Sequence, residues 1–196
     1  MKRQISLAEY RNVDLAILTG LMLVSQAVIQ WAISYWYADM TGYIVSPVAA
    51  VVALVMMRWN FWAAIPAALG GVIFSLLSGG TMEQTLIYSV GNLLSLLACL
   101  FLKLTGKERV RGNVVLSLLF AVITQLLMQL GRAGVAALLG HSWRACLDFI
   151  TTDAMSILFT MVIIWIVRRV EGLFEDQIHY LLRVQQERSE KGGEQL

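Results

Sequence analysis

Long apolar segments constrain this chain more than any other feature of its sequence. Six can be delimited, at about residues 13–37, 43–59, 61–77, 85–104, 113–139 and 146–167. A helix of about 20 apolar residues crosses the ~30 Å hydrocarbon core of a bilayer. Charged residues make up only 14% of the chain, against about 25% in an average soluble domain. The sequence therefore predicts an all-α integral membrane protein, with six transmembrane helices in one bundle.

The second and third segments differ from the others because they are short and contain both prolines, Pro47 and Pro66. Proline and the Arg-Trp-Asn break between them favour a tight helical hairpin with irregular ends. Cys99 and Cys146 fall in different segments at opposite expected depths. We therefore predict neither a disulfide nor a metal site.

The distribution of Lys and Arg predicts the orientation. With six crossings, 13 of the 15 Lys and Arg residues lie on the side of the two termini. Only Arg144 lies on the other side, and Arg132 lies within the fifth segment. Because cytoplasmic loops of membrane proteins are enriched in Lys and Arg, both termini are predicted to be cytoplasmic. The charged N-terminus lacks a cleavage signal, which predicts a retained first helix.

The chain is predicted to have two parts, a transmembrane domain at 1–170 and a cytoplasmic helix and polar tail at 171–196. The helix prediction rests on apolar residues that share one helical face: Val170, Leu173, Phe174, Ile178, Leu181 and Leu182. Such a helix either lies on the membrane surface or docks a partner subunit. The sequence leaves both alternatives open.

Arg132 is the one charged residue inside the fifth segment. It follows Val114, the expected cytoplasmic edge, by 18 residues, or about 27 Å at ~1.5 Å per residue, which places it near the outer interface. Gln125 and Gln129 lie on the same helical face. Three interpretations remain open: Arg132 pairs with Asp153, it anchors an anionic ligand group, or it extends to the lipid interface.

Other polar and aromatic groups converge on the same outer half of the bundle and suggest a cavity open to the outside. The candidate substrate-binding residues are Gln30, Tyr88, Asn92, Gln129, Arg132 and Asp153, with Trp31, Tyr35, Trp36 and Trp143 as stacking groups and Tyr37 beside them. The alternative for the amides is hydrogen bonding between helices. The alternative for the aromatic residues is an interfacial belt.

Several catalytic motifs are absent from the sequence. Gly106-Lys107-Glu108 is followed by Arg109, so no P-loop is present, and neither HExxH nor GxSxG occurs. We find no nucleophile with a base and therefore predict that the chain is not an enzyme and has no cofactor. If it drives transport, the energy comes from another protein.

Residues 42–80, GYIVSPVAAVVALVMMRWNFWAAIPAALGGVIFSLLSGG, resemble the substrate-binding S component of energy-coupling factor transporters. The likeness lies in the Ser-Pro opening, the Arg-Trp turn, Trp62, Pro66 and the glycine pairs. The length, the six segments and the outer polar groups agree with that family over nearly the whole chain.

The resemblance implies a bacterial cytoplasmic-membrane subunit that binds a vitamin or precursor from outside. Its partners would be a transmembrane coupling subunit and two cytoplasmic ATPases. In the family, small residues on the first helix contact the coupling subunit, and Ala16 and Gly20 occupy such positions here. The absence of a nickel- or cobalt-type N-terminus favours an organic substrate without a metal.

Two other functions remain open. A structural membrane protein of the cell-shape or cell-wall scaffold type needs no ligand and fits the same size and number of segments. A membrane enzyme that depends on Asp148 or Asp153 is a third alternative.

Overall fold

The computed structural model describes residues 6–36 and 45–193, and the expected aromatic residue Tyr37 lies outside this range. The described residues form helices and turns, without a strand among them. In chain order the elements are α1 (Leu7–Trp36), α2 (Val48–Trp59), the 3-10 turn η1 (Asn60–Ala63), α3 (Ala64–Leu77), α4 (Met82–Asn92), the 3-10 turn η2 (Leu93–Leu97), α5 (Ala98–Thr105), α6 (Lys107–Gly112), α7 (Val114–Leu138), α8 (Trp143–Thr151), α9 (Ala154–Val167) and α10 (Gln177–Gly193). The predicted all-α class is confirmed.

Five helical stretches in this part of the chain are long and apolar enough to cross a membrane. They are Leu7–Trp36, Val48–Leu77, Met82–Thr105, Val114–Leu138 and Trp143–Val167. Large apolar side chains also remain exposed along one face of α1, at Val13, Ile17, Leu21, Val24 and Val28. A contiguous apolar surface of this kind is stable against lipid and not against water. The chain is therefore a membrane protein.

The stretch Val48–Leu77 is a helical hairpin, as the two prolines and the central break predict. Asn60, with φ of +53°, is the one non-glycine residue with positive φ in the described chain, and the backbone leaves the helical conformation there. Asp14 of α1 contacts Arg58 near the end of α2, whereas Gln26, further along α1, contacts Ser46 just before α2. The two helices are therefore antiparallel.

The short helix α2 lies at the centre of the bundle. Eleven of its 12 residues are buried, and it contacts α1, α3, α7 and α9. Its sequence of Val, Ala and Met has small or adaptable side chains on every face, which permits contact with neighbours all round. These four helices pack around α2.

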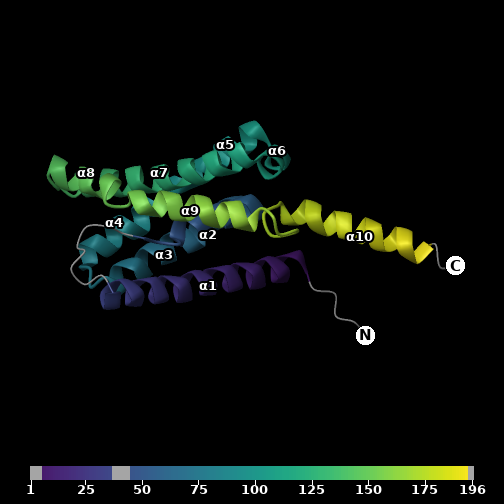
Figure 1. The fold of residues 1–196 in the computed structure, drawn as a ribbon, viewed down its shortest axis with the longest axis horizontal. Helices are drawn as coiled ribbons and strands as arrows, with labels where there is room; N and C mark the ends of the chain where they lie inside the picture. The colour runs from purple at the N-terminus through teal and green to yellow at the C-terminus, as the bar shows by residue number, and fades with distance from the viewer. Residues whose placement is uncertain (1–5, 37–44, 194–196) are drawn as a thin grey trace.

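Figure 1 shows the beginning of α1 together with α6 and α10 at one end of the bundle, which we call the terminal end. At the opposite end, called the far end, lie α8 and the start of α4. Two helical stretches change geometry between these ends. The fourth segment changes from α-helix to the 3-10 turn η2 between α4 and α5. The sixth segment is interrupted at Thr152 and Asp153, between α8 and α9.

The segment after α9 corrects one prediction. Residues 168–175 are turns and bends, and α10 begins only at Gln177. The residues from Val170 to Ile178 therefore do not share one helical face. Phe174 is instead buried at 1% exposure among the core residues. The apolar periodicity failed here because Phe174 packs into the bundle and Arg58 binds the backbone carbonyls of Gly172 and Leu173, which leaves the segment irregular.

Candidate functional site

Arg132 of α7 is buried and contacts polar side chains of two neighbouring segments. Its Nη1 donates to Oδ2 of Asp153 at 2.7 Å, and its Nε donates to Oδ1 of Asn92 at 2.7 Å. The guanidinium carbon also lies 4.8 Å from the ring centroid of Tyr88. Of the three interpretations that the sequence left open, the structure therefore shows the pair with Asp153.

Asp153 occupies the break between α8 and α9, at the position before the first residue of α9. Its Oδ2 accepts a second hydrogen bond, from Nε2 of Gln125 at 2.8 Å, and its backbone oxygen accepts from Nε2 of Gln129 at 3.2 Å. Charge-assisted hydrogen bonds of this kind are about twice as strong as neutral ones. The break in the sixth segment thus gives a buried carboxylate to the polar face of α7.

Asn92 reaches Arg132 because α4 and α7 approach closely. A Cβ atom on Gly131 would lie 2.0 Å from the backbone oxygen of Gly91, and one on Gly91 would lie 2.6 Å from Cα of Arg132. Asn92 also donates to the backbone oxygen of Ala67 on α3, at 3.0 Å. The sequence reasoning missed this glycine contact, although small residues within apolar segments are a known signal for it.

The buried polar network continues toward α1 and α2. Ser46 donates through Oγ to Oε1 of Gln26 at 2.8 Å and through its backbone nitrogen to Oγ of Ser156 at 3.1 Å. Ser156 belongs to the first turn of α9, next to Asp153. Polar groups from α1, α3, α4, α7 and α9 therefore meet in one network, which we call the polar network.

Three atoms of the polar network have no hydrogen-bond partner among the described residues. They are Nε2 of Gln26, Oε1 of Gln129 and Oδ1 of Asp153, and all three side chains are at most 1% exposed. Buried polar atoms normally find a partner, in the protein or in an ordered water. One donor and two acceptors of the polar network are thus unpaired within the part of the chain that the structure describes.

The predicted stacking residues are placed apart from this network. Trp31, Tyr35 and Trp36 contact one another, with ring centroids 5.8–6.2 Å apart, and all three are strongly exposed. Trp143 is 76% exposed at the beginning of α8. Gln30 is half-buried, and its backbone oxygen accepts from Ser34. In the part of the chain that the structure describes, none of these residues contacts Arg132.

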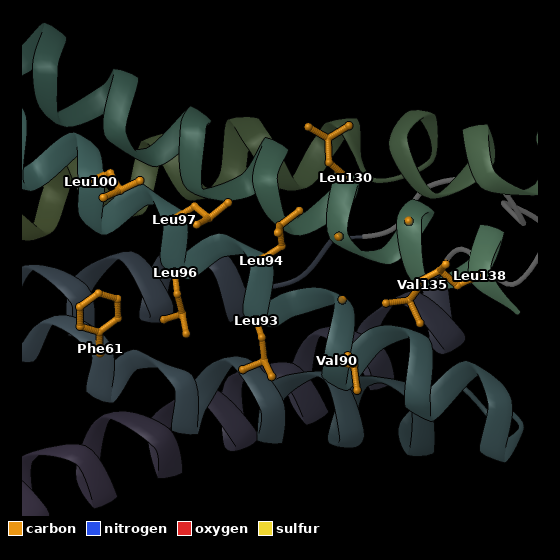
Figure 2. Close-up of a pocket in the computed structure, with 13 residues that line it drawn as sticks. Phe61, Val90, Leu93, Leu94, Leu96, Leu97, Leu100, Leu130, Val135 and Leu138 are labelled. Carbon is orange, nitrogen blue, oxygen red and sulfur yellow. The ribbon is translucent and has the colours of Figure 1, made fainter.

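Two grooves lie on the outer surface of the bundle. One, of about 570 Å³, runs between η2 and α7, and Figure 2 shows that the side chains drawn along it contain only carbon. The other, of about 400 Å³, lies between α1 and α3, and both Ala16 and Gly20 line it. None of the ten predicted substrate-binding residues lines either groove.

A second polar cluster, which the sequence reasoning missed, attaches the segment after α9 to the terminal end of the bundle. Residues 170–177, which we call the clasp, are held by Arg58, whose Nη1 donates to the backbone oxygens of Gly172 and Leu173 at 2.7 and 3.0 Å. The same guanidinium binds both carboxylate oxygens of Asp14, at 2.7 and 2.8 Å. Only the location of Arg58 beside a helix break could have suggested this role.

Basic residues near α6 complete the attachment of the clasp. Lys107 pairs with Asp176 at 2.6 Å, and Arg111 pairs with the buried Glu175. Burial of Asp176 opposes its ionisation, but the hydrogen bond and charge of Lys107, with the backbone N–H groups of His179 and Ile178, outweigh it and lower the pKa of Asp176. The Asp176 carboxylate of the clasp is therefore ionised at neutral pH.

Comparison with known proteins gives no relatives: no family model, no curated protein and no solved structure matches this chain.

Proposed function

We propose that this chain is the substrate-binding membrane subunit of an energy-coupling factor importer. In this proposal it captures a vitamin-like organic molecule from outside a bacterial cell. A coupling subunit and two cytoplasmic ATPases then drive delivery to the inside. The chain crosses the cytoplasmic membrane six times with both termini inside, so the far end faces outward.

The observation that carries the proposal is the polar network. An apolar bundle gains nothing in stability from unpaired buried amide and carboxylate atoms, since each costs about 1–3 kcal/mol. Gln26, Gln129 and Asp153 retain such atoms where three or more helices meet. An ionisable side chain inside a membrane bundle, such as Asp153, is by default a candidate functional residue.

The geometry also favours one chemistry of substrate. Because Asp153 neutralises Arg132, an anionic group would have to displace Asp153 to reach the guanidinium. The unpaired acceptors on Gln129 and Asp153 instead suit a molecule that donates hydrogen bonds from N–H groups. A neutral or cationic nitrogen heterocycle fits these atoms better than the carboxylate or phosphate expected from the lone arginine.

The test is thermal unfolding of the detergent-purified protein against a panel of vitamins and precursors. A ligand at 100 times its dissociation constant adds about 2.7 kcal/mol to stability. Replacing the Gln129 amide, in Gln129→Met, is expected to reduce that gain. Thr124→Val is the matched control, since Thr124 is buried on the same helix and its hydroxyl bonds only the backbone of Phe120.

The outcome of the panel separates the candidate functions. A stabilising vitamin whose effect is lost in Gln129→Met and kept in Thr124→Val supports substrate binding at the polar network. Equal loss in both variants, or no loss in either, contradicts that site. Co-purification with ATPases and a coupling subunit tests the transport assignment independently.

One observation favours a second candidate, a structural membrane protein of the cell-wall or cell-shape type. Arg132 binds both Asn92 of α4 and Asp153 at the start of α9, as a residue that only joins helices would do. This candidate predicts that no vitamin in the panel stabilises the protein and that it co-purifies with cell-wall proteins.

A further inference from the structure

The groove between α1 and α3 lies apart from the polar network, and substrate binding at that network does not involve it. Its walls are apolar or small for most of its length. The residues that the argument uses are Asn12, Ala16, Gly20 and Leu23 on α1 and Ile65 and Leu69 on α3. Gly20 leaves space at its centre, because a Cβ atom there would meet no other atom within 4 Å.

A cation lies at the terminal-end mouth of this groove. The guanidinium carbon of Arg11 is 3.8 Å from the ring centroid of Trp62. Trp62 lies in η1, three residues before Ile65, and Ile65 and Leu69 share one face of α3. The stacked Arg11–Trp62 pair therefore continues the wall of the groove toward the membrane surface.

The charge of Arg11 is not neutralised by the described residues. Its Nε is buried without a hydrogen-bond partner. The nearest acidic residues along α1 are engaged elsewhere, since Asp14 binds Arg58 and Trp59, and Glu9 accepts from the backbone of Ser6. A guanidinium in this state is a binding group for an anion, and Arg suits the phosphate of an anionic lipid at a membrane surface.

The length of the groove matches one leaflet of a bilayer. From Asn12 to Leu23 is 11 residues, or about 16 Å at ~1.5 Å per residue. That is close to half of the ~30 Å hydrocarbon core. A partner transmembrane helix would contact the bundle along the whole hydrocarbon core. An acyl chain of a lipid would occupy only one leaflet, which is the length of this groove.

We propose that this groove binds one acyl chain of an anionic phospholipid, with the lipid phosphate at Arg11 in the leaflet of the terminal end. The site depends on the membrane setting and not on the identity of a transported substrate. In the transport proposal, Ala16 and Gly20 also face the coupling subunit. The lipid and that subunit then compete for the same groove, and the lipid leaves when the subunit docks.

The experiment measures lipid retained by the full chain, by native mass spectrometry, and its thermal stability in detergent with each added lipid. The probes are phosphatidylglycerol, phosphatidylcholine with the same acyl chains, and glycerol phosphate without chains. Gly20→Leu fills the groove, and Arg11→Gln removes the cation. The structure offers matched controls for both variants.

Gly134→Leu is the control for Gly20→Leu, because Gly134 lines the other groove and a Cβ atom there also meets nothing within 4 Å. Arg169→Gln is the control for Arg11→Gln. Arg169 also stacks on a tryptophan, with its guanidinium carbon 3.9 Å from the Trp165 ring centroid, but Arg169 and Trp165 do not line the α1–α3 groove.

We expect one retained phosphatidylglycerol per chain and at least a fivefold loss of its affinity in Gly20→Leu and in Arg11→Gln, with both controls unchanged. Equal retention of phosphatidylcholine would overturn the role of Arg11. If glycerol phosphate stabilised the protein as much as phosphatidylglycerol does, the site would bind a free phosphate group and the acyl-chain proposal would be wrong. Unchanged lipid retention in Gly20→Leu, with loss of coupling-subunit binding, would assign the groove to that protein and leave the transport proposal standing.

Discussion

Arg132 and Asp153 are almost completely buried, at 4% and 1% exposure, and each is the ion-pair partner of the other. A pair of this kind adds little net stability over apolar residues of equal size, because both charges lose their solvation. Removal of one partner is different, since the remaining charge stays buried without compensation. The pair therefore specifies how α7 meets α9 more than it stabilises the fold.

This asymmetry predicts the result of a double-mutant cycle. Arg132→Met alone should destabilise the detergent-solubilised protein by about 3–5 kcal/mol, as measured for other broken buried pairs. Arg132→Met combined with Asp153→Leu should recover a large part of that loss, because no buried charge remains. Chemical unfolding followed by tryptophan fluorescence measures both. If the double variant were as unstable as the sum of the two single variants, the pair would not be the reason for the loss.

The glycine contact between α4 and α7 gives a second prediction at this scale. Gly131→Ala places a Cβ atom 2.0 Å from the backbone oxygen of Gly91, so the helices must separate. We expect a loss of about 1–3 kcal/mol, as for other overpacked positions. The control is Gly134→Ala on the same helix, where a Cβ atom meets nothing within 4 Å. It should be neutral or gain about 0.5–1 kcal/mol from helix propensity.

At the scale of elements, the clasp joins α10 to the terminal ends of α1, α2 and α6. Arg58 is the residue that links most of these elements, because it binds Asp14 as well as the carbonyls of Gly172 and Leu173. Gln177, the first residue of α10, accepts from the hydroxyl of Tyr10 at 3.1 Å. The position of α10 thus depends on side chains of the bundle and not on its own apolar face.

The Lys107–Asp176 pair makes the stability of the clasp depend on pH. The pKa of Asp176 is lowered from its ordinary value of 3.8. A lowered carboxylate pKa contributes stability that is complete above the unfolded value and is lost as the pH falls through the folded value. As the pH falls from 5 to below 3.8, the wild type should therefore lose more stability than Asp176→Asn. Thermal unfolding at each pH tests this, and identical pH profiles for the two proteins would exclude the contribution.

At the scale of the whole molecule, the proposed topology rests on the hairpin of α2 and α3. Each helix is short, with 12 and 14 residues, or about 18 and 21 Å at ~1.5 Å per residue. The hairpin turn lies near the terminal end, because Arg58 binds the clasp. Six crossings require this turn to be on the same side as the termini.

Cysteine labelling with a membrane-impermeant maleimide tests that topology, in a background of Cys99→Ser and Cys146→Ser. Phe61→Cys at the hairpin turn and Arg109→Cys on α6 should react only after the cells are opened. Ser78→Cys after α3 and Arg144→Cys on α8 should react in intact cells. All four native side chains are exposed in the structure. Labelling of Phe61→Cys from outside would contradict the six-crossing arrangement.

The bundle was largely predictable from the sequence, but the site was predictable only in part. Apolar segments and their breaks locate the helices because insertion into lipid depends on local composition. The same helical periodicity identified the polar face of α7 with Gln125, Gln129 and Arg132. It could not show that Asn92 and Asp153 complete the site, since these contacts join residues 40 and 21 positions away from Arg132.

The sequence by itself determined the membrane class, the all-α fold, the hairpin and the polar stripe on α7, because each depends on residues close together in the chain. Tertiary structure decided the partners of Arg132, the exposure of Trp31 and Trp143, and the irregular clasp in place of a longer amphipathic helix. These features depend on packing between distant segments. Arg58 illustrates the reason: its three attachments join α1, α2 and the clasp, and no local pattern encodes them.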